Sequence, residues 1–194
     1  MNQAENFDHF LPQRNSILLR GLILIITGSL LTLFSAIKPD VYLMSESSSW
    51  LPLVSMVILL TGIMECMEAY FSRHRKEYYT HLQFGVFDTV IGIVFLTELN
   101  KSAEKLILLA ACYLMIKGIF RVIAAYSVKF PNATSTIVGG LISAVLGFLL
   151  WQEWIFSSMW FICFCLSLDV MTRGWALFRF GVWLKKLHKE QEGI

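Results

Sequence analysis

Several charged residues fall inside long apolar stretches of this 194-residue chain, where a charge is energetically expensive. On insertion scales, an ionised side chain at the centre of a bilayer costs about 2.5–3.5 kcal/mol. Charges in such positions usually pair with one another, titrate, or bind a small polar ligand. The candidates are Glu65, Glu68, Asp88, Lys117, Arg121, Asp169 and Arg173.

The spacing of these residues places several of them on shared helix faces, because side chains three or four residues apart are neighbours on a helix. Acidic and basic side chains could then pair between neighbouring helices. This arrangement leaves two interpretations open: a network of ion pairs that fixes the register of the helices, or a site that titrates or binds a small polar ligand. The pairs that share a face are Glu65 with Glu68, Lys117 with Arg121, and Asp169 with Arg173.

The other reactive residue types show no catalytic or metal-binding pattern. The cysteines lie in apolar stretches without a CxxC motif, and the histidines lie in predicted tails and loops. The chain contains no phosphate-binding loop and no nucleophile elbow. We therefore expect no enzymatic activity, no metal and no cofactor. The net charge of +2 gives no indication of a nucleic-acid partner.

The surrounding composition is that of an integral membrane protein. Hydrophobic residues make up 56% of the chain and charged residues only 15%, whereas soluble domains average about 25% charged residues. A membrane span needs about 20 mostly apolar residues. We expect six spans. The third and fifth are short, and we expect them to extend into their flanking loops. The expected spans are 16–37, 50–71, 82–97, 105–127, 135–150 and 155–178.

Lysine and arginine in the short connections predict the orientation, because cytoplasmic loops carry an excess of these residues. The side that contains both tails, 1–15 and 185–194, is much richer in them. Both termini are therefore expected in the cytoplasm. The richer side carries Arg14, Arg73, Arg75, Lys76, Lys129, Lys185, Lys186 and Lys189, and the other carries Lys38, Lys101 and Lys105.

Regularly spaced glycines indicate an internal repeat. The odd-numbered spans each contain two glycines seven residues apart, close to two helical turns, so both lie on one face. The even-numbered spans each contain one glycine, and these are 56 residues apart. Small residues let membrane helices approach closely. The glycines are Gly21 and Gly28, Gly85 and Gly92, Gly140 and Gly147, and then Gly62, Gly118 and Gly174.

These glycines predict an all-α fold of three hairpins, each made of an odd-numbered span and the span after it. Because each hairpin has two spans, all three enter the membrane in the same direction. Such repeats are related by an axis along the membrane normal. We therefore expect a six-helix bundle with pseudo-threefold symmetry.

The glycine pattern resembles the HdeD-like acid-resistance membrane proteins of bacteria. The resemblance covers about 18–184 and includes the Leu-Ser-Leu-Asp segment at 166–169, which is followed by Arg173-Gly174. It implies a place in a bacterial inner membrane and a contribution to acid or envelope stress resistance, and it supplies no catalytic residues. The longer first outer loop, with Ser45–Ser49, departs from the family pattern.

Two other functions remain open at this point. The chain could be an accessory subunit of a larger membrane complex, or a small conduit for protons or solutes. Its expected partners are the lipid bilayer and either further copies of itself or other membrane proteins.

Overall fold

The computed structural model describes residues 14–38, 50–71, 78–99, 102–128, 133–152 and 159–191. The predicted tails, apart from the parts inside the first and last helices, and the predicted loops at 39–49 and 72–77 lie outside these residues. The fold is all-α with six helices, as the sequence predicts. They are α1 (Arg14–Ile37), α2 (Leu51–Phe71), α3 (Tyr78–Thr97), α4 (Ala103–Val128), α5 (Ala133–Trp151) and α6 (Met159–Gln191).

The helix bounds follow local chemistry. Helix α2 begins next to Pro52, which fits the first turn of a helix because the N–H groups there have no partner within the helix. Helix α3 begins four residues before the expected third span, at Tyr78. Helix α6 continues to Gln191, well past the expected end of the sixth span. Its last turns are more polar than the rest of the helix.

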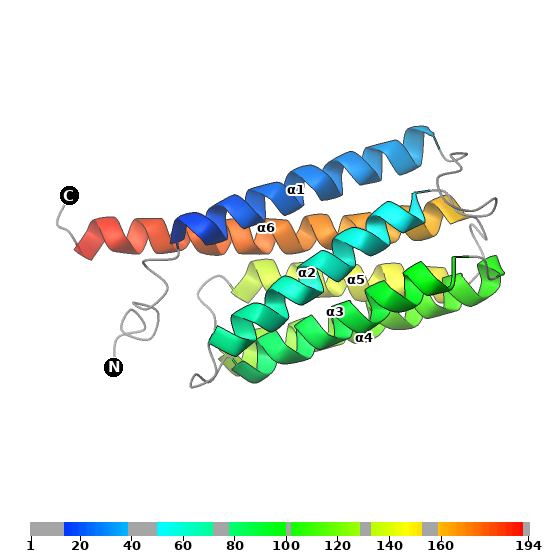
Figure 1. Cartoon of the computed structure of the whole chain (residues 1–194). Helices are drawn as coiled ribbons and strands as arrows, with labels where there is room; N and C mark the ends of the chain where they lie inside the picture. The colour runs from blue at the N-terminus through cyan, green and yellow to red at the C-terminus, as the bar shows by residue number, and fades with distance from the viewer. Residues whose placement is uncertain are drawn as a thin grey trace.

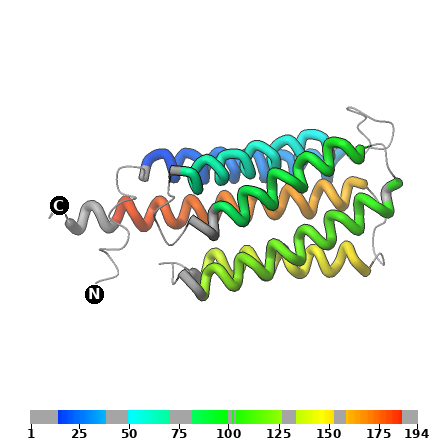
Figure 2. The backbone as a smooth tube through the Cα atoms, turned by 60° about the horizontal axis from the view of Figure 1, so that its bottom comes forward, coloured from blue at the N-terminus to red at the C-terminus, as the bar shows by residue number. Residues whose placement is uncertain are grey.

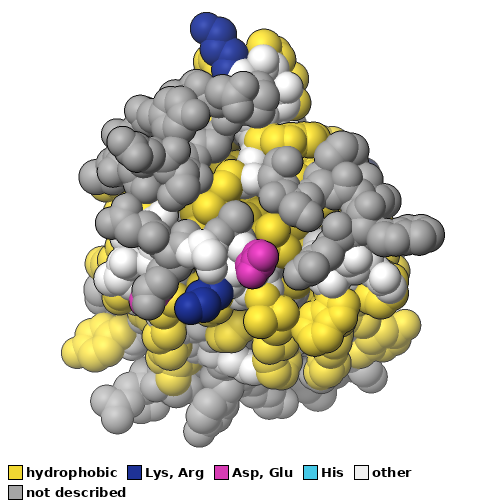
Figure 3. Space-filling model, turned by 90° about the vertical axis from the view of Figure 1, so that its right-hand side faces the viewer, with side chains coloured by type: hydrophobic (Ala, Val, Ile, Leu, Met, Phe, Trp, Pro, Cys, Tyr) yellow, Lys and Arg dark blue, Asp and Glu magenta, His cyan; other side chains and the backbone are white. Residues whose placement is uncertain are grey.

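Five of the helices are long and apolar enough to cross a membrane, and the apolar part of α3, Leu82–Thr97, is shorter. The flanks of the bundle fit a lipid environment, because many large hydrophobic side chains lie exposed on the helices. The end-on view in Figure 3 shows hydrophobic side chains around the rim of the bundle. Helix α1 shows this as a stripe with spacings of three and four residues. The stripe consists of Leu19, Ile23, Ile26, Leu30, Leu33 and Ile37. The chain is a multi-pass membrane protein.

The helices pack as three close antiparallel pairs, α1 with α6, α2 with α3, and α4 with α5 (Figures 1 and 2). Each hairpin that defines a repeat joins an odd-numbered helix to the next helix along the sequence, so every close pair joins helices of two different hairpins. Contacts within those hairpins are fewer, above all between α1 and α2. Helix α6 is the most central, because it packs against α1, α2, α4 and α5.

All nine predicted glycines lie against a neighbouring helix, and the three pairs share one register. Gly21 faces Gly174, Gly85 faces Gly62, and Gly140 faces Gly118. Seven residues further along the odd-numbered helices, the second glycine of each meets a residue that precedes the partner glycine by three positions. These second contacts are Gly28 with Met171, Gly92 with Leu59, and Gly147 with Met115.

The shared register means that the three pairs are built alike. The close approach explains why glycine occupies these positions, since a methyl group added at Gly118 would lie 2.5 Å from the carbonyl oxygen of Gly140. Threefold symmetry about the membrane normal remains a prediction. Superposition of 16–72, 82–127 and 135–184 would test it.

Candidate functional site

The carboxylate of Asp88, in the middle of α3, is fully buried and surrounded by hydrogen-bond donors. The hydroxyl group of Tyr113 donates a hydrogen bond of 2.9 Å to it. The ammonium group of Lys117 lies 3.0 Å from the same oxygen, and Arg173 of α6 forms an ion pair with the other oxygen. An unpaired buried ion would cost several kcal/mol. These three donors offset part of the cost of burying the Asp88 carboxylate.

A second buried carboxylate, Asp169 of α6, lies on the other side of Lys117. Its oxygens are 2.9 Å from the Lys117 ammonium group and 3.1 Å from the Arg121 guanidinium group. It also accepts a hydrogen bond from Ser143 of α5. Lys117 therefore bridges two carboxylates that belong to different helices. Its ammonium group also lies 4.7 Å from the centre of the Tyr113 ring, within the range of a cation–π contact.

The ion pairs continue outward from this centre to α2 and α4. Arg173 also pairs with Glu65 of α2, and Arg121 donates a 3.4 Å hydrogen bond to Thr172. The result is one continuous chain whose charges alternate in sign, which we call the ion-pair chain. In order it contains Glu65, Arg173, Asp88, Lys117, Asp169 and Arg121.

Glu68, the seventh residue singled out in the sequence, does not belong to the ion-pair chain. It pairs with Arg20 of α1, and its side chain is 45% exposed, against 12% for Arg20. This pair joins α1 to α2 near one end of the bundle. At the other end Trp50, just before α2, stacks on Phe34 of α1 and donates a 2.9 Å hydrogen bond to the Lys38 carbonyl.

Arg20 and Tyr113 are site residues that sequence reasoning did not assign. Arg20 directly precedes a repeat glycine, as Lys117 and Arg173 do, so its position contained a signal. With Arg20 included, the paired charges of the described helices comprise four carboxylates and four cations. Another arginine of α6, Arg179, is exposed.

The repeat explains two of the polar contacts. Asp88 and Ser143 each lie three residues after a repeat glycine, and Tyr113 and Asp169 each lie five residues before one. The contact of Tyr113 with Asp88 therefore corresponds to the contact of Ser143 with Asp169. In the first repeat the same positions hold Leu24 and Val57, so this polar contact occurs only in the second and third repeats.

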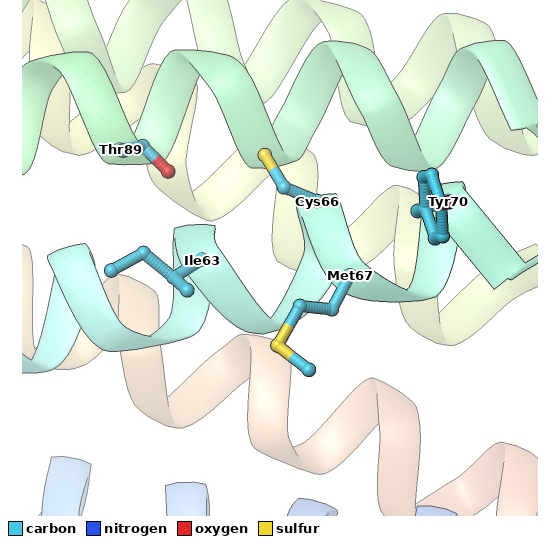
Figure 4. Close-up of a pocket in the computed structure, with 5 residues that line it drawn as sticks. All are labelled: Ile63, Cys66, Met67, Tyr70 and Thr89. Atoms are coloured by element: carbon cyan, nitrogen blue, oxygen red, sulfur yellow. The ribbon is translucent and has the colours of Figure 1, made fainter.

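A shallow pocket of about 370 Å³ lies between α2 and α3 (Figure 4), and none of the charged residues above is among its lining residues. Its lining is mainly apolar, with only one hydroxyl from Thr89 and one from Tyr70. The lining residues are Ile63, Cys66, Met67, Tyr70 and Thr89. The charged side chains are therefore the candidate site, and this pocket is a separate surface feature.

The described residues contain no group of three or more His, Cys, Asp or Glu side chains that could hold a metal ion. The four cysteines are free thiols. Every carboxylate of the ion-pair chain has a cationic partner. Chemically, the arrangement can hold helices in register and can respond when one partner loses its charge.

The fold and its paired intramembrane charges define a multi-pass membrane protein built from helical repeats. Residues 47–97 and 83–152 match a family described as a short repeat of unknown function, DUF308. The two matches together cover more than half of the chain, so the chain belongs to this family. No curated protein and no solved structure matches the chain significantly.

Proposed function

We propose that the protein is a non-enzymatic component of a bacterial inner membrane that contributes to resistance against acid or envelope stress. HdeD-like proteins carry the same short repeat, which supports the resemblance drawn from the glycines. The observation that carries the proposal is the balanced set of four carboxylates and four cations within the apolar helices. Acid acts on such a set directly, because protonation neutralises the carboxylates and leaves their partners charged.

Glu68 is the carboxylate of the set that is most accessible to solvent. Its side chain is 45% exposed, whereas Asp88 and Asp169 are almost completely buried. Its cationic partner is Arg20 of α1, and α1 otherwise packs mainly on α6. Loss of the Glu68 charge would release one of the few links between α1 and α2. A packed element that changes partners when a charge is lost is a common basis for pH-dependent switching.

The other charges around Glu68 belong to the same response. Glu65 lies one turn earlier on α2 and pairs with Arg173 of α6. Protonation of Glu65 would leave Arg173 with Asp88 as its remaining carboxylate. Protonation of Glu68 and Glu65 would thus loosen the contacts of α2, while the pairs around Lys117 hold the centre of the bundle together.

The proposal is tested by survival of a deletion strain at low pH. The wild-type gene should restore survival, and a double variant with Arg20→Leu and Glu68→Leu should fold in the membrane yet restore less. Full protection by that variant would mean that the pair only joins helices. Equal survival of the deletion and parent strains under acid and envelope stress would refute the stress role.

Experiments on the purified protein separate this proposal from the other two functions. Gentle purification from the native membrane should give the chain alone or as a homo-oligomer. A stoichiometric partner would favour an accessory subunit. Proton or solute flux through the pure protein in liposomes would favour a conduit.

A further inference from the structure

The guanidinium group of Arg121, at one end of the ion-pair chain, has donors that no described residue accepts. One terminal nitrogen, Nη1, meets Asp169 and Thr172. The other, Nη2, is buried and has no hydrogen-bond partner within the described segments. Only 9% of the side chain is exposed. Because buried N–H groups in native proteins are nearly always satisfied, by protein or by ordered water, an acceptor must lie beside Nη2.

Helix α5 presents a polar, small-residue face on this side of the bundle. Ser135, Gly139 and Ser143 are spaced by four residues and therefore share one face. Ser143 reaches Asp169, and Gly139 lies beside Arg121 and Thr172. The hydroxyl of Ser135, in the first turn of α5, is a second buried group without a partner among the described residues. From Ser135 to Ser143 the face runs about 12 Å along the helix.

The packing around Gly139 is looser than that around the repeat glycines. A methyl group added there would meet its nearest atoms at 3.6–3.8 Å, on Thr172 and Arg121. At the adjacent Gly140, the same addition would lie 2.8 Å from the backbone oxygen of Gly118. Gly139 therefore lies in ordinary contact with Arg121 and Thr172, and does not serve the closest helix contact.

The charge balance decides which acceptor fits. The four carboxylates already match the four cations, so an added anion would leave one uncompensated negative charge in the apolar bundle. A buried water is neutral and typically makes about three hydrogen bonds to groups that lack other partners. We propose that water molecules bind Arg121 Nη2 and the Ser135 hydroxyl, and connect Asp169 to the end of the bundle at which α5 begins.

The test compares two arginines of the wild-type protein. Arg121 and Arg173 are equally buried, at 9% side-chain exposure each. Nη2 of Arg173 also makes no hydrogen bond to the described residues, but it forms an ion pair with Glu65, whereas no described carboxylate pairs with Nη2 of Arg121. The full chain is labelled with ¹⁵N-arginine and reconstituted in lipid bilayers. Solid-state NMR then measures how fast polarisation passes from water protons to each guanidinium group, with chloride omitted from the buffer.

Transfer to Arg121 should be about twofold or more faster than transfer to Arg173, because only Arg121 has a water in direct contact. The S135A variant should slow transfer to Arg121 and leave Arg173 unchanged, with Ser55→Ala as a matched control at a buried serine whose hydroxyl donates to the Leu51 carbonyl. Equal transfer to the two arginines, or no effect of S135A, would overturn the proposal. So would transfer to Arg121 that falls when bromide is added, since an anion would then occupy the site.

Discussion

Lys117 lies between two carboxylates, and its separations from Asp88 and Asp169 are almost equal, 3.0 and 2.9 Å. One side chain of α4 is therefore shared by α3 and α6. Membrane helices lack a hydrophobic drive toward one another, so polar pairs of this kind supply part of their association. Removing a residue at the end of the ion-pair chain is more informative than removing Lys117, because Lys117 then keeps both of its partners.

Arg121→Leu should destabilise the protein by about 3–5 kcal/mol, because it removes one of the two cations that compensate buried Asp169. Unfolding in mixed micelles with increasing SDS measures the loss. Arg179→Leu is the matched control, since Arg179 is an exposed arginine on α6. Adding Asp169→Leu to Arg121→Leu should recover much of the stability, because Lys117 still keeps Asp88. Equal stability of the two single variants would contradict the burial of this pair.

Gly118→Ala should destabilise the protein by about 1–3 kcal/mol, because the added methyl group overpacks the α4–α5 contact. It would lie 2.5 Å from a carbonyl oxygen and 2.6 Å from the Ala144 nitrogen, which are both backbone atoms. The same change at Gly139 should be neutral or slightly stabilising, because its contacts are ordinary and alanine favours a helix. Thermal unfolding of both variants in detergent provides the comparison, and a larger loss for Gly139→Ala would contradict the shared glycine register.

The sequence predicts the six helices because the apolar stretches match the thickness of a bilayer, and it predicts which glycines lie at helix contacts. It does not determine which helix each glycine meets. Periodicity defines a face of one helix, whereas pairing depends on the path of the whole chain. Gly118 could have met a helix of its own repeat as readily as Gly140. The pairing of α1 with α6, at opposite ends of the sequence, has no local signal.

Charges could be selected from the sequence because they interrupt apolar stretches, and Asp88 and Asp169 stand out for that reason. Arg20 did not stand out, because an arginine near the start of the first span could also reach the headgroup region. Tyr113 resembles any aromatic residue of a span. Both residues acquire a role only once neighbouring helices place a carboxylate beside them, and a single sequence does not contain that information.

Fusions of a reporter to the C-terminus should report a cytoplasmic location. Helix α1 begins and α6 ends at the same end of the bundle (Figure 1), and Lys185 and Lys186 lie exposed near that end of α6. Lysines next to a span favour the cytoplasmic side. Alkaline phosphatase fused there should be inactive, and a cytoplasmic reporter should be active. The reverse result would invert the orientation and place Glu68 near the opposite face of the membrane.

Lowering the pH should separate α1 from α2. Protonation removes the charge of Glu68, so the attraction between Glu68 and Arg20 is present at neutral pH and is lost as the pH falls. Spin labels at Leu19 and Met67, exposed positions next to the pair, would report the distance by double electron–electron resonance in nanodiscs. The distribution should shift to longer distances in acid, and Glu68→Gln should give the acid distribution at neutral pH. Glu98→Gln, just after the end of α3, should behave like the wild type. A Glu68→Gln distribution identical to the wild type at both pH values would exclude this pair as the point at which acid acts.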